Sequence, residues 1–257
     1  MMSPSTTPVR GIFFDLYGTL LMYGDMKIAW QDWSAALHTC LRRHGLSLSP
    51  EAFATPCDRF FGKEEPPARA DEFTVFERRI HTLCEDLNLR VPAEDIRRIA
   101  TTTVGVWQRH IAPDPECRPV LKALQSQKTL GLISNFNHPP HVHQVLAEFR
   151  LADFFEVIVV SGEVGVKKPN PRIFEVALER TGLPPGAVVY VGDTDEDVAG
   201  ARAAAIRPIA IQRVAAGRER QALDFRVKQE TNHVSTIPAE VRVVTRLSEL
   251  IPLLAEP

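Results

Sequence analysis

Short apolar runs that alternate with helix-like stretches are the feature that most limits the folds open to this chain. Each run is long enough for one buried strand. Strands that alternate with helices predict an α/β fold, in which helices cover both faces of a parallel sheet. The expected strands are residues 9–14, 129–133, 156–160, 187–191, 208–211 and 241–244, and the expected helices are residues 119–127, 142–149, 171–181 and 197–205.

Residues 23–111 have a different pattern. Apolar side chains recur there at helical spacing, and we find no convincing buried strand among them. We therefore expect an all-helical cap domain inserted after the first strand, with residues 62–70 as a loop inside it. The remaining residues, 1–22 and 112–257, are expected to form the core domain.

Polar residues stand where the expected strands end. Asp15 directly follows the first apolar run, in the sequence FFDLYGTLL of residues 13–21, and Gly18 and Thr19 come shortly after it. Ligands of parallel α/β sheets bind at the carboxyl ends of the strands. Gly18 permits a close approach of the backbone, and Thr19 offers a hydroxyl to an anion or to the Asp15 carboxylate. The sequence thus predicts a polar site at this edge of the sheet.

Three further motifs follow along the chain. They are LISN, which contains Ser134 and Asn135, VGVKKPNPRIF, which contains Lys168, and VGDTDEDVAGA, which contains Asp193 and Asp197. Each motif alone occurs by chance in many chains. All four in this order resemble the haloacid dehalogenase superfamily of hydrolases, and the resemblance extends from residue 9 to about residue 254. It implies a Rossmann-like parallel core with a helical cap between the first two motifs.

The resemblance also implies a role for each motif residue. Asp15 matches the nucleophile, whose carboxylate attacks the substrate and forms a covalent intermediate that water later releases. Lys168 matches the cation that offsets the negative charge of nucleophile and substrate. Thr19 and Ser134 match the hydroxyls that bind the transferred group, and Asn135 is expected beside them as a substrate-binding residue.

The fourth motif points to a metal. Asp193 and Asp197 match the acidic pair that positions Mg²⁺ in the phosphatases of the superfamily. A physical argument agrees, because three carboxylates gathered at one anion-binding site would repel each other and the substrate. A hard divalent cation removes this repulsion and clamps the charge of a phosphoryl group. We therefore expect Mg²⁺ as cofactor, held by Asp15, the backbone carbonyl of Tyr17, Asp193 and Asp197.

Tyr17 departs from the phosphatase pattern. Phosphatases of this superfamily usually carry an Asp at this position as general acid and base, whereas a Tyr resembles the metal-free 2-haloacid dehalogenases. Against a dehalogenase, Asp193 has little use without a metal, Phe174 stands where a Tyr is expected, and Arg42 and Arg43 are poorly placed to hold a halide. Loss of a general acid slows turnover by about 10²–10⁴-fold and does not abolish it.

Three hypotheses therefore stay open. The first is Mg²⁺-dependent hydrolysis of a small phosphorylated metabolite through an aspartyl-phosphate on Asp15, with Tyr17 and Lys168 as the other expected catalytic residues. The second is metal-independent 2-haloacid dehalogenation. The third is a non-catalytic relative in which Tyr17 marks a decayed site. We rank them in this order, because the other motif residues are all present.

Charge balance and apolar pattern exclude some partners. Thirty basic and 32 acidic side chains give a formal net charge of −2, which leaves no basic surplus for nucleic-acid binding. No apolar run approaches the ~20 residues that cross a bilayer, and the start of the chain lacks the apolar core of a secretory signal. We expect a cytoplasmic protein with no membrane partner. Residues 214–235, rich in Arg, Gln and Glu, are expected to form an exposed helix.

Simpler explanations than catalysis apply to several residues outside the motifs. We expect Trp33 in the core of the cap and Arg79 on a solvated helix face. The histidines His138, His141 and His143 match no zinc pattern, so we expect them in a loop and at the start of a helix.

Overall fold

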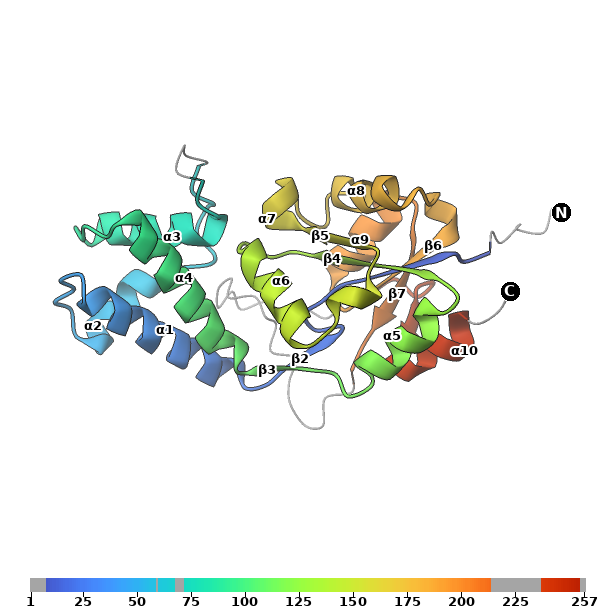
Figure 1. Cartoon of the computed structure of the whole chain (residues 1–257), viewed down its shortest axis with the longest axis horizontal. Helices are drawn as coiled ribbons and strands as arrows, with labels where there is room; N and C mark the ends of the chain where they lie inside the picture. Colours follow the sequence, from blue (N-terminus) through green and yellow to red (C-terminus); the bar gives the residue numbers. More distant parts are fainter. Residues whose placement is uncertain (1–7, 59, 68–71, 214–236, 255–257) are drawn as a thin grey trace.

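The six expected strands form one parallel sheet in the order β5-β4-β1-β6-β7-β8 (Figure 1). The computed structural model describes residues 8–58, 60–67, 72–213 and 237–254. The prediction of an α/β fold with a parallel sheet is confirmed. The strands are β1 (Gly11–Phe14), β4 (Thr129–Ser134), β5 (Val157–Val160), β6 (Val188–Gly192), β7 (Arg207–Ile211) and β8 (Arg242–Val244).

Helices cover both faces of the sheet, and β1 shows why. Successive side chains of a strand point to opposite faces. Phe13 packs in one apolar cluster with Phe174 of α8, whereas Phe14 belongs to the opposite cluster with Leu121 of α5 and Val142 of α6. The helices of this part of the chain are α5 (Cys117–Gln125), α6 (Pro139–Glu148), α7 (Ser161–Val164), α8 (Arg172–Thr181), α9 (Asp195–Ala203) and α10 (Leu250–Leu254).

In the described chain, four helices between β1 and α5 form a separate lobe, which we call the helical insertion (Figure 1). Local signals start two of them. The Asp25 carboxylate accepts from two backbone N–H groups at the start of the first helix, and Thr74 and Glu77 form a reciprocal capping box at the start of the third. The helices are α1 (Met26–Arg42), α2 (Pro50–Cys57), α3 (Val75–Asp86) and α4 (Ala93–Gln108).

A two-stranded antiparallel ribbon joins the helical insertion to the sheet. Its strands, β2 (Leu21–Tyr23) and β3 (Ile111–Pro113), carry the chain out and back side by side. Three residues are too few to show the alternating pattern of a strand, so the sequence did not reveal this ribbon. The expected domain boundaries, at residues 22/23 and 111/112, fall inside it.

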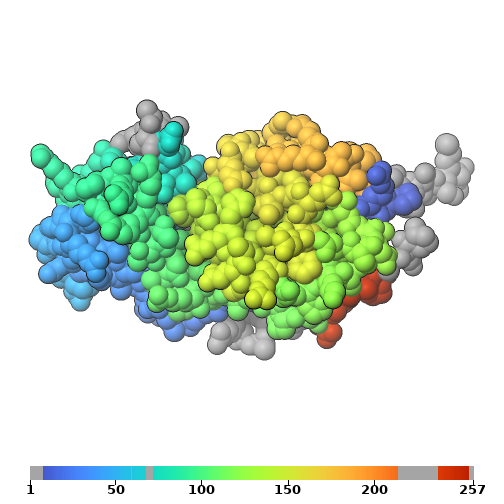
Figure 2. All heavy atoms as spheres, in the orientation of Figure 1, coloured from blue at the N-terminus to red at the C-terminus, as the bar shows by residue number. Residues whose placement is uncertain are grey.

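The insertion and the core share one apolar cluster. Trp33 and Phe76 of the insertion belong to the same buried cluster as Leu121 and Val142 beside the sheet. In the space-filling view the two parts lie directly against each other (Figure 2). This continuity fixes the insertion over one end of the sheet.

Two expectations reach beyond the described residues. The helix expected at residues 214–235 lies outside them, as do residues 68–70 of the loop expected at 62–70, whereas residues 62–67 contain no helix or strand. Within the part of the chain that the structure describes, no helix combines the length and apolar character that a membrane span requires.

Candidate active site

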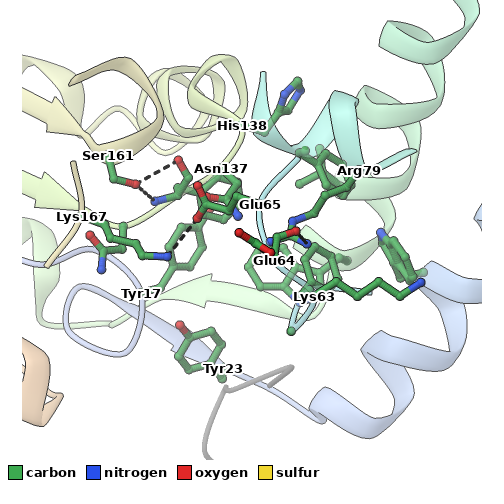
Figure 3. Close-up of a pocket in the computed structure, with 18 residues that line it drawn as sticks. Tyr17, Tyr23, Lys63, Glu64, Glu65, Arg79, Asn137, His138, Ser161 and Lys167 are labelled. Carbon is green, nitrogen blue, oxygen red and sulfur yellow. Dashed lines mark hydrogen bonds and ion pairs between the residues drawn. The ribbon is translucent and has the colours of Figure 1, made fainter. Parts of the chain in front are cut away.

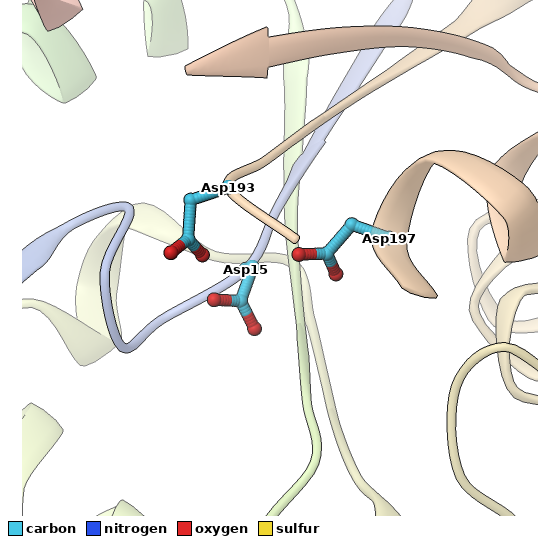
Figure 4. A group of neighbouring side chains, drawn as sticks. All are labelled: Asp15, Asp193 and Asp197. Carbon is cyan, nitrogen blue, oxygen red and sulfur yellow. The ribbon is translucent and has the colours of Figure 1, made fainter. Parts of the chain in front are cut away.

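The first and fourth motifs meet because their strands are neighbours in the sheet. Phe14 of β1 pairs in register with Leu132 of β4 on one side and Val191 of β6 on the other. The residues that follow these strands therefore reach the same edge. Carboxylate oxygens of Asp15, Asp193 and Asp197 lie within 4.8 Å of one another (Figure 4).

Gly18 allows the loop after β1 to pass close to Asp193. Its φ of 89° lies in the left-handed region, and a Cβ at this position would overlap the Asp193 carboxylate. The next residue, Thr19, is fully buried and donates its hydroxyl hydrogen to Oδ1 of Asp193 over 3.4 Å. Arg213 donates to the backbone carbonyl of Thr19 over 2.6 Å and pairs with Asp114, which holds the loop in place.

Lys168 is the buried cation of the site. Its Nζ donates to Oδ1 of Asp15 over 2.6 Å, to Oδ1 of Asp197 over 2.7 Å and to the Tyr190 hydroxyl over 3.0 Å. Burial works against the charged ammonium, but the charges of Asp15 and Asp197 outweigh it and raise the pKa of Lys168 above its usual value. Lys168 therefore carries its positive charge at neutral pH.

All four hydrogen-bonding positions of the Asp197 carboxylate are used within the protein. Oδ1 accepts from Lys168 and from the Tyr190 hydroxyl at 2.9 Å, and Oδ2 accepts from the backbone N–H and the hydroxyl of Thr194 at 3.0 and 2.7 Å. Burial alone would raise the pKa of Asp197, but the Lys168 charge and these hydrogen bonds hold it below its usual range. Asp197 thereby anchors both Lys168 and the start of α9.

The other two carboxylates are held in a less favourable environment. Burial, against the opposing charge of Lys168, raises the pKa of Asp15 to about 6. Burial and the charges of Asp15 and Asp197 also raise the pKa of Asp193 well above its usual value. Among the described residues, the Lys168 ammonium pairs with Asp15 and Asp197 but not with Asp193, so the three carboxylates leave the site with excess negative charge. Oxygen donors with uncompensated charge are the ligand set that suits Mg²⁺.

Asn135 holds the backbone at Lys168. Its Nδ2 donates to the Lys168 carbonyl over 3.0 Å, and its Oδ1 accepts from the Lys168 N–H over 2.8 Å. Ser134 is buried at the end of β4, one residue before it. The substrate-binding roles of Thr19, Ser134 and Asn135 stay predictions, and for Asn135 the geometry adds a positioning role.

Tyr17 reaches from the core to the helical insertion. Its hydroxyl donates to Oε1 of Gln108 in α4 over 3.1 Å, and His141 of α6 contacts the same oxygen at 3.1 Å. Its ring stacks on Phe136 at 5.2 Å. Burial and the nearby Asp15 charge raise the pKa of Tyr17 above its usual value, so the phenol keeps its proton. Gln108 belongs to no motif, and no sequence signal marked it.

A cavity of about 650 Å³ lies between the core and the insertion (Figure 3). Tyr17 and Phe136 line it from the core, and Trp33, Phe61 and Arg79 line it from the insertion. The expectation of a solvated Arg79 was wrong, because this side chain is buried and donates to the carbonyl of Phe60 over 3.1 Å. Trp33 packs in the core of the insertion, as expected, and also forms part of the cavity wall.

Direct contacts close the insertion over the core beside this cavity. The N–H of Phe76 donates to the Asn137 carbonyl over 3.1 Å, and the Thr74 hydroxyl lies 3.0 Å from Nδ1 of His138. Lys167 donates to Glu65 over 2.9 Å, as Figure 3 shows. The histidines lie in a loop and at the start of α6, in agreement with the sequence.

The parallel core, the carboxylates at its strand ends and the inserted helices define a hydrolase of the Rossmann-like type. A family model described as haloacid dehalogenase-like hydrolase matches residues 9–205, and the chain belongs to this family. The resemblance seen in the four motifs is thereby confirmed.

Two curated relatives that the chain resembles are named as phosphatases. The chain is 35% identical to a glyceraldehyde 3-phosphate phosphatase of Methanopyrus kandleri over 40% of its own length and 45% of that protein, so it spans less than half of that relative. It is 29% identical to a phosphoglycolate phosphatase of Shigella dysenteriae over 76% of its own length and 78% of the relative.

Solved structures show the same fold in both classes. A HAD phosphatase from Thermococcus onnurineus superposes with a TM-score of 0.62 at 21% identity, over 96% of this chain and 98% of that one. A 2-haloacid dehalogenase from Pseudomonas syringae gives 0.63 at 23% identity over the same shares. The fold alone therefore does not choose between phosphatase and dehalogenase.

Proposed function

We propose that the protein is a Mg²⁺-dependent phosphatase of a small phosphorylated metabolite, acting through an aspartyl-phosphate on Asp15. One observation carries this proposal. Three carboxylates lie within 4.8 Å of one another, and the one ammonium found among them in the described residues pairs with only two, Asp15 and Asp197, so the site needs a further positive charge. The phosphatases among the relatives support the same reading.

Asp15, Asp193 and the backbone carbonyl of Tyr17 would hold the metal. Asp197 is also an expected ligand, but its four internal hydrogen bonds favour a role in orienting Lys168. When bound, Mg²⁺ would neutralise the carboxylates and stabilise negative charge on the phosphoryl oxygens.

Asp15 is the proposed nucleophile. Its carboxylate oxygen attacks phosphorus, the bond from phosphorus to the leaving oxygen breaks, and the phosphoryl group stays on Asp15. Water then attacks phosphorus, releases inorganic phosphate and restores the carboxylate. Lys168 offsets the charge of Asp15 throughout, and the hydroxyls of Thr19 and Ser134 bind the phosphoryl oxygens. The helical insertion acts as a cap that excludes bulk water.

Tyr17, at the position of the usual general acid, is poorly suited to protonate the leaving group. The Tyr17 hydroxyl already donates its proton to Gln108. Its raised pKa also makes the phenol a poor acid. The proposed substrates are therefore those whose leaving group departs without a proton, such as acyl and aryl phosphates.

Dehalogenation is the second candidate, and Tyr17 is the observation that favours it. A dehalogenase would displace halide from carbon with the same Asp15 nucleophile and without a metal. The structure places Arg42 and Arg43, the expected halide-binding candidates, on the exposed surface. Asp193 would then add a half-buried negative charge that pairs with no cation among the described residues.

The test compares both reactions in one preparation. The protein is freed of metal with EDTA and assayed with 4-nitrophenyl phosphate, before and after addition of Mg²⁺, and with chloroacetate in EDTA. We expect phosphate release only with Mg²⁺, and a loss of at least about 100-fold in Asp193→Asn. Chloride release in EDTA at a rate above that of phosphate release would replace this proposal with the dehalogenase.

A further inference from the structure

We propose that the leaving group of the substrate carries a planar aromatic ring, which occupies the cavity between the helical insertion and the core. This inference rests on the proposed phosphatase function and names the substrate class for that site. It is carried by the position, the lining and the size of the cavity.

The cavity begins next to the catalytic residues. Tyr17 stands two residues after Asp15, and Asn135 and Lys167 are direct neighbours of Ser134 and Lys168; all three line the cavity. A phosphoryl group held at Asp15 would therefore direct the rest of the substrate into this space.

Aromatic residues are enriched in the lining. Seven of the 18 lining residues are Phe, Tyr or Trp, whereas these residues make up 7% of the chain. They include one stacked pair on the core side of the cavity and one on the insertion side. Tyr17 and Phe136 of the core have ring centroids 5.2 Å apart, and Phe61 and Phe76 of the insertion have centroids 5.8 Å apart with ring planes 11° from parallel. A flat ring between such faces gains stacking as well as apolar burial.

The size of the cavity favours substrates larger than a two- or three-carbon phosphate. A volume of about 650 Å³ lies in the range of sites that hold drug-sized ligands. A two- or three-carbon phosphate would fill little of it and would leave most of the rings without a ligand contact. An aromatic leaving group fills the space and contacts the rings.

The test measures binding without turnover. Two phosphonates that cannot be hydrolysed, 4-nitrobenzylphosphonate and methylphosphonate, are titrated into the Mg²⁺-loaded protein by calorimetry. We expect the aromatic phosphonate to bind at least about tenfold more tightly, since the burial of one ring contributes at least this factor. The nitroaryl group should also quench tryptophan emission. Two of the three tryptophans, Trp33 and Trp107, line the cavity, and Trp30 stacks on Trp33 at 4.9 Å.

Two phenylalanine variants localise the effect. Phe61→Ala, in the cavity wall, should lower the ratio of the two dissociation constants by at least about threefold. Phe154→Ala, an equally half-buried ring on the core far from the cavity, should leave the ratio unchanged. Equal affinity for the two phosphonates, or an equal effect of both variants, would overturn the inference.

Turnover then identifies the kind of aromatic substrate and separates this inference from the proposed function. Preference for 1-naphthyl phosphate would place the ring directly on the leaving oxygen. Preference for a nucleoside 5′-monophosphate, which is an alkyl phosphate, would keep the ring in the cavity but reject the preference for leaving groups that depart without a proton. Higher kcat/KM for phosphoglycolate than for either would overturn the inference but leave the phosphatase intact. Tight binding of the aromatic phosphonate without hydrolysis of any phosphate would reject the phosphatase and leave the ring site standing.

Discussion

Nζ of Lys168 lies 2.6 Å from Oδ1 of Asp15, although 153 positions separate the two residues in the chain. The same ammonium lies 2.7 Å from Asp197, and all three side chains are buried. One cation thus pairs with two buried carboxylates. Its removal would leave both carboxylates without compensation in a poorly solvated site, which is more damaging than the loss of a surface ion pair.

Lys168→Met should therefore abolish turnover and lower the free energy of unfolding by about 3–5 kcal/mol. Lys167→Met is the matched control for stability, because this neighbouring lysine is half-exposed and pairs with Glu65 on the surface. That pair contributes at most about 1 kcal/mol. Urea unfolding of both variants measures the difference. Similar losses in the two variants would show that Lys168 is not the charge on which the buried cluster depends.

Asp15→Asn should keep the fold and lose at least about 10⁴-fold in kcat with any substrate that the wild type accepts. The amide retains the shape of the carboxylate but cannot form the covalent intermediate. Circular dichroism and gel filtration check the fold, and single-turnover assays check for residual chemistry. Near-normal activity in a folded Asp15→Asn variant would eliminate covalent catalysis on this residue.

The fold could be predicted from the sequence because its signals are local. Each buried strand is a short apolar run, and each motif follows such a run directly, so Asp15 and Asp193 were expected at one edge of the sheet before the pairing of β1 with β6 was known. The close backbone approach at Gly18 could also be predicted, and in the structure the loop passes the Asp193 carboxylate at this residue.

The cavity could not be predicted in the same way. Helical periodicity shows that a residue such as Trp33 or Arg79 lies on a helix, but not which neighbours it meets when the insertion folds back on the core. The contact of Tyr17 with Gln108 spans 91 positions and follows no motif. The hydrogen bonds that Asp197 accepts from Thr194 and Tyr190 could not be predicted either. They depend on the residue at which α9 begins and on the direction of the Tyr190 side chain in β6.

His141 should make the fold sensitive to acid. Burial, together with the nearby His138, lowers the pKa of His141 from 6.5 to about 4. Between these values the unfolded chain binds a proton that the folded chain excludes. The free energy of unfolding should therefore fall as the pH drops from about 6.5 to 4, by about 3 kcal/mol from this residue.

The matched variants are His141→Gln and His143→Gln. Glutamine at residue 141 keeps a donor for Gln108 but cannot titrate, so this variant should lack that part of the acid sensitivity. His143 lies in the same helix with an exposed side chain, and its replacement should leave the pH profile of the wild type. Urea unfolding from pH 4 to 8 gives the three curves. Parallel curves for the wild type and His141→Gln would contradict the prediction.

Tyr17→Asp should shift the substrate preference toward alkyl phosphates. The Tyr17 phenol donates to Gln108 and is a poor acid, whereas a carboxyl group at this position would supply a proton to the leaving group. The gain should be largest for alkyl phosphates, whose leaving oxygen needs the proton most. It should stay below the full general-acid effect, because the variant also loses the ring that stacks on Phe136 and the hydrogen bond to Gln108.

Tyr17→Asn separates these two effects. It removes the ring and the phenol in the same way, but it adds no acid. The measurement is the ratio of kcat/KM for an alkyl phosphate to that for an aryl phosphate in the wild type and both variants. We expect this ratio to rise in Tyr17→Asp at least about tenfold above its value in Tyr17→Asn, because the two side chains have nearly the same shape and only the carboxyl group can act as an acid. Equal ratios in two well-folded variants would mean that residue 17 is not an empty acid position. Another group, such as Asp195 at the start of α9, would then have to supply the proton.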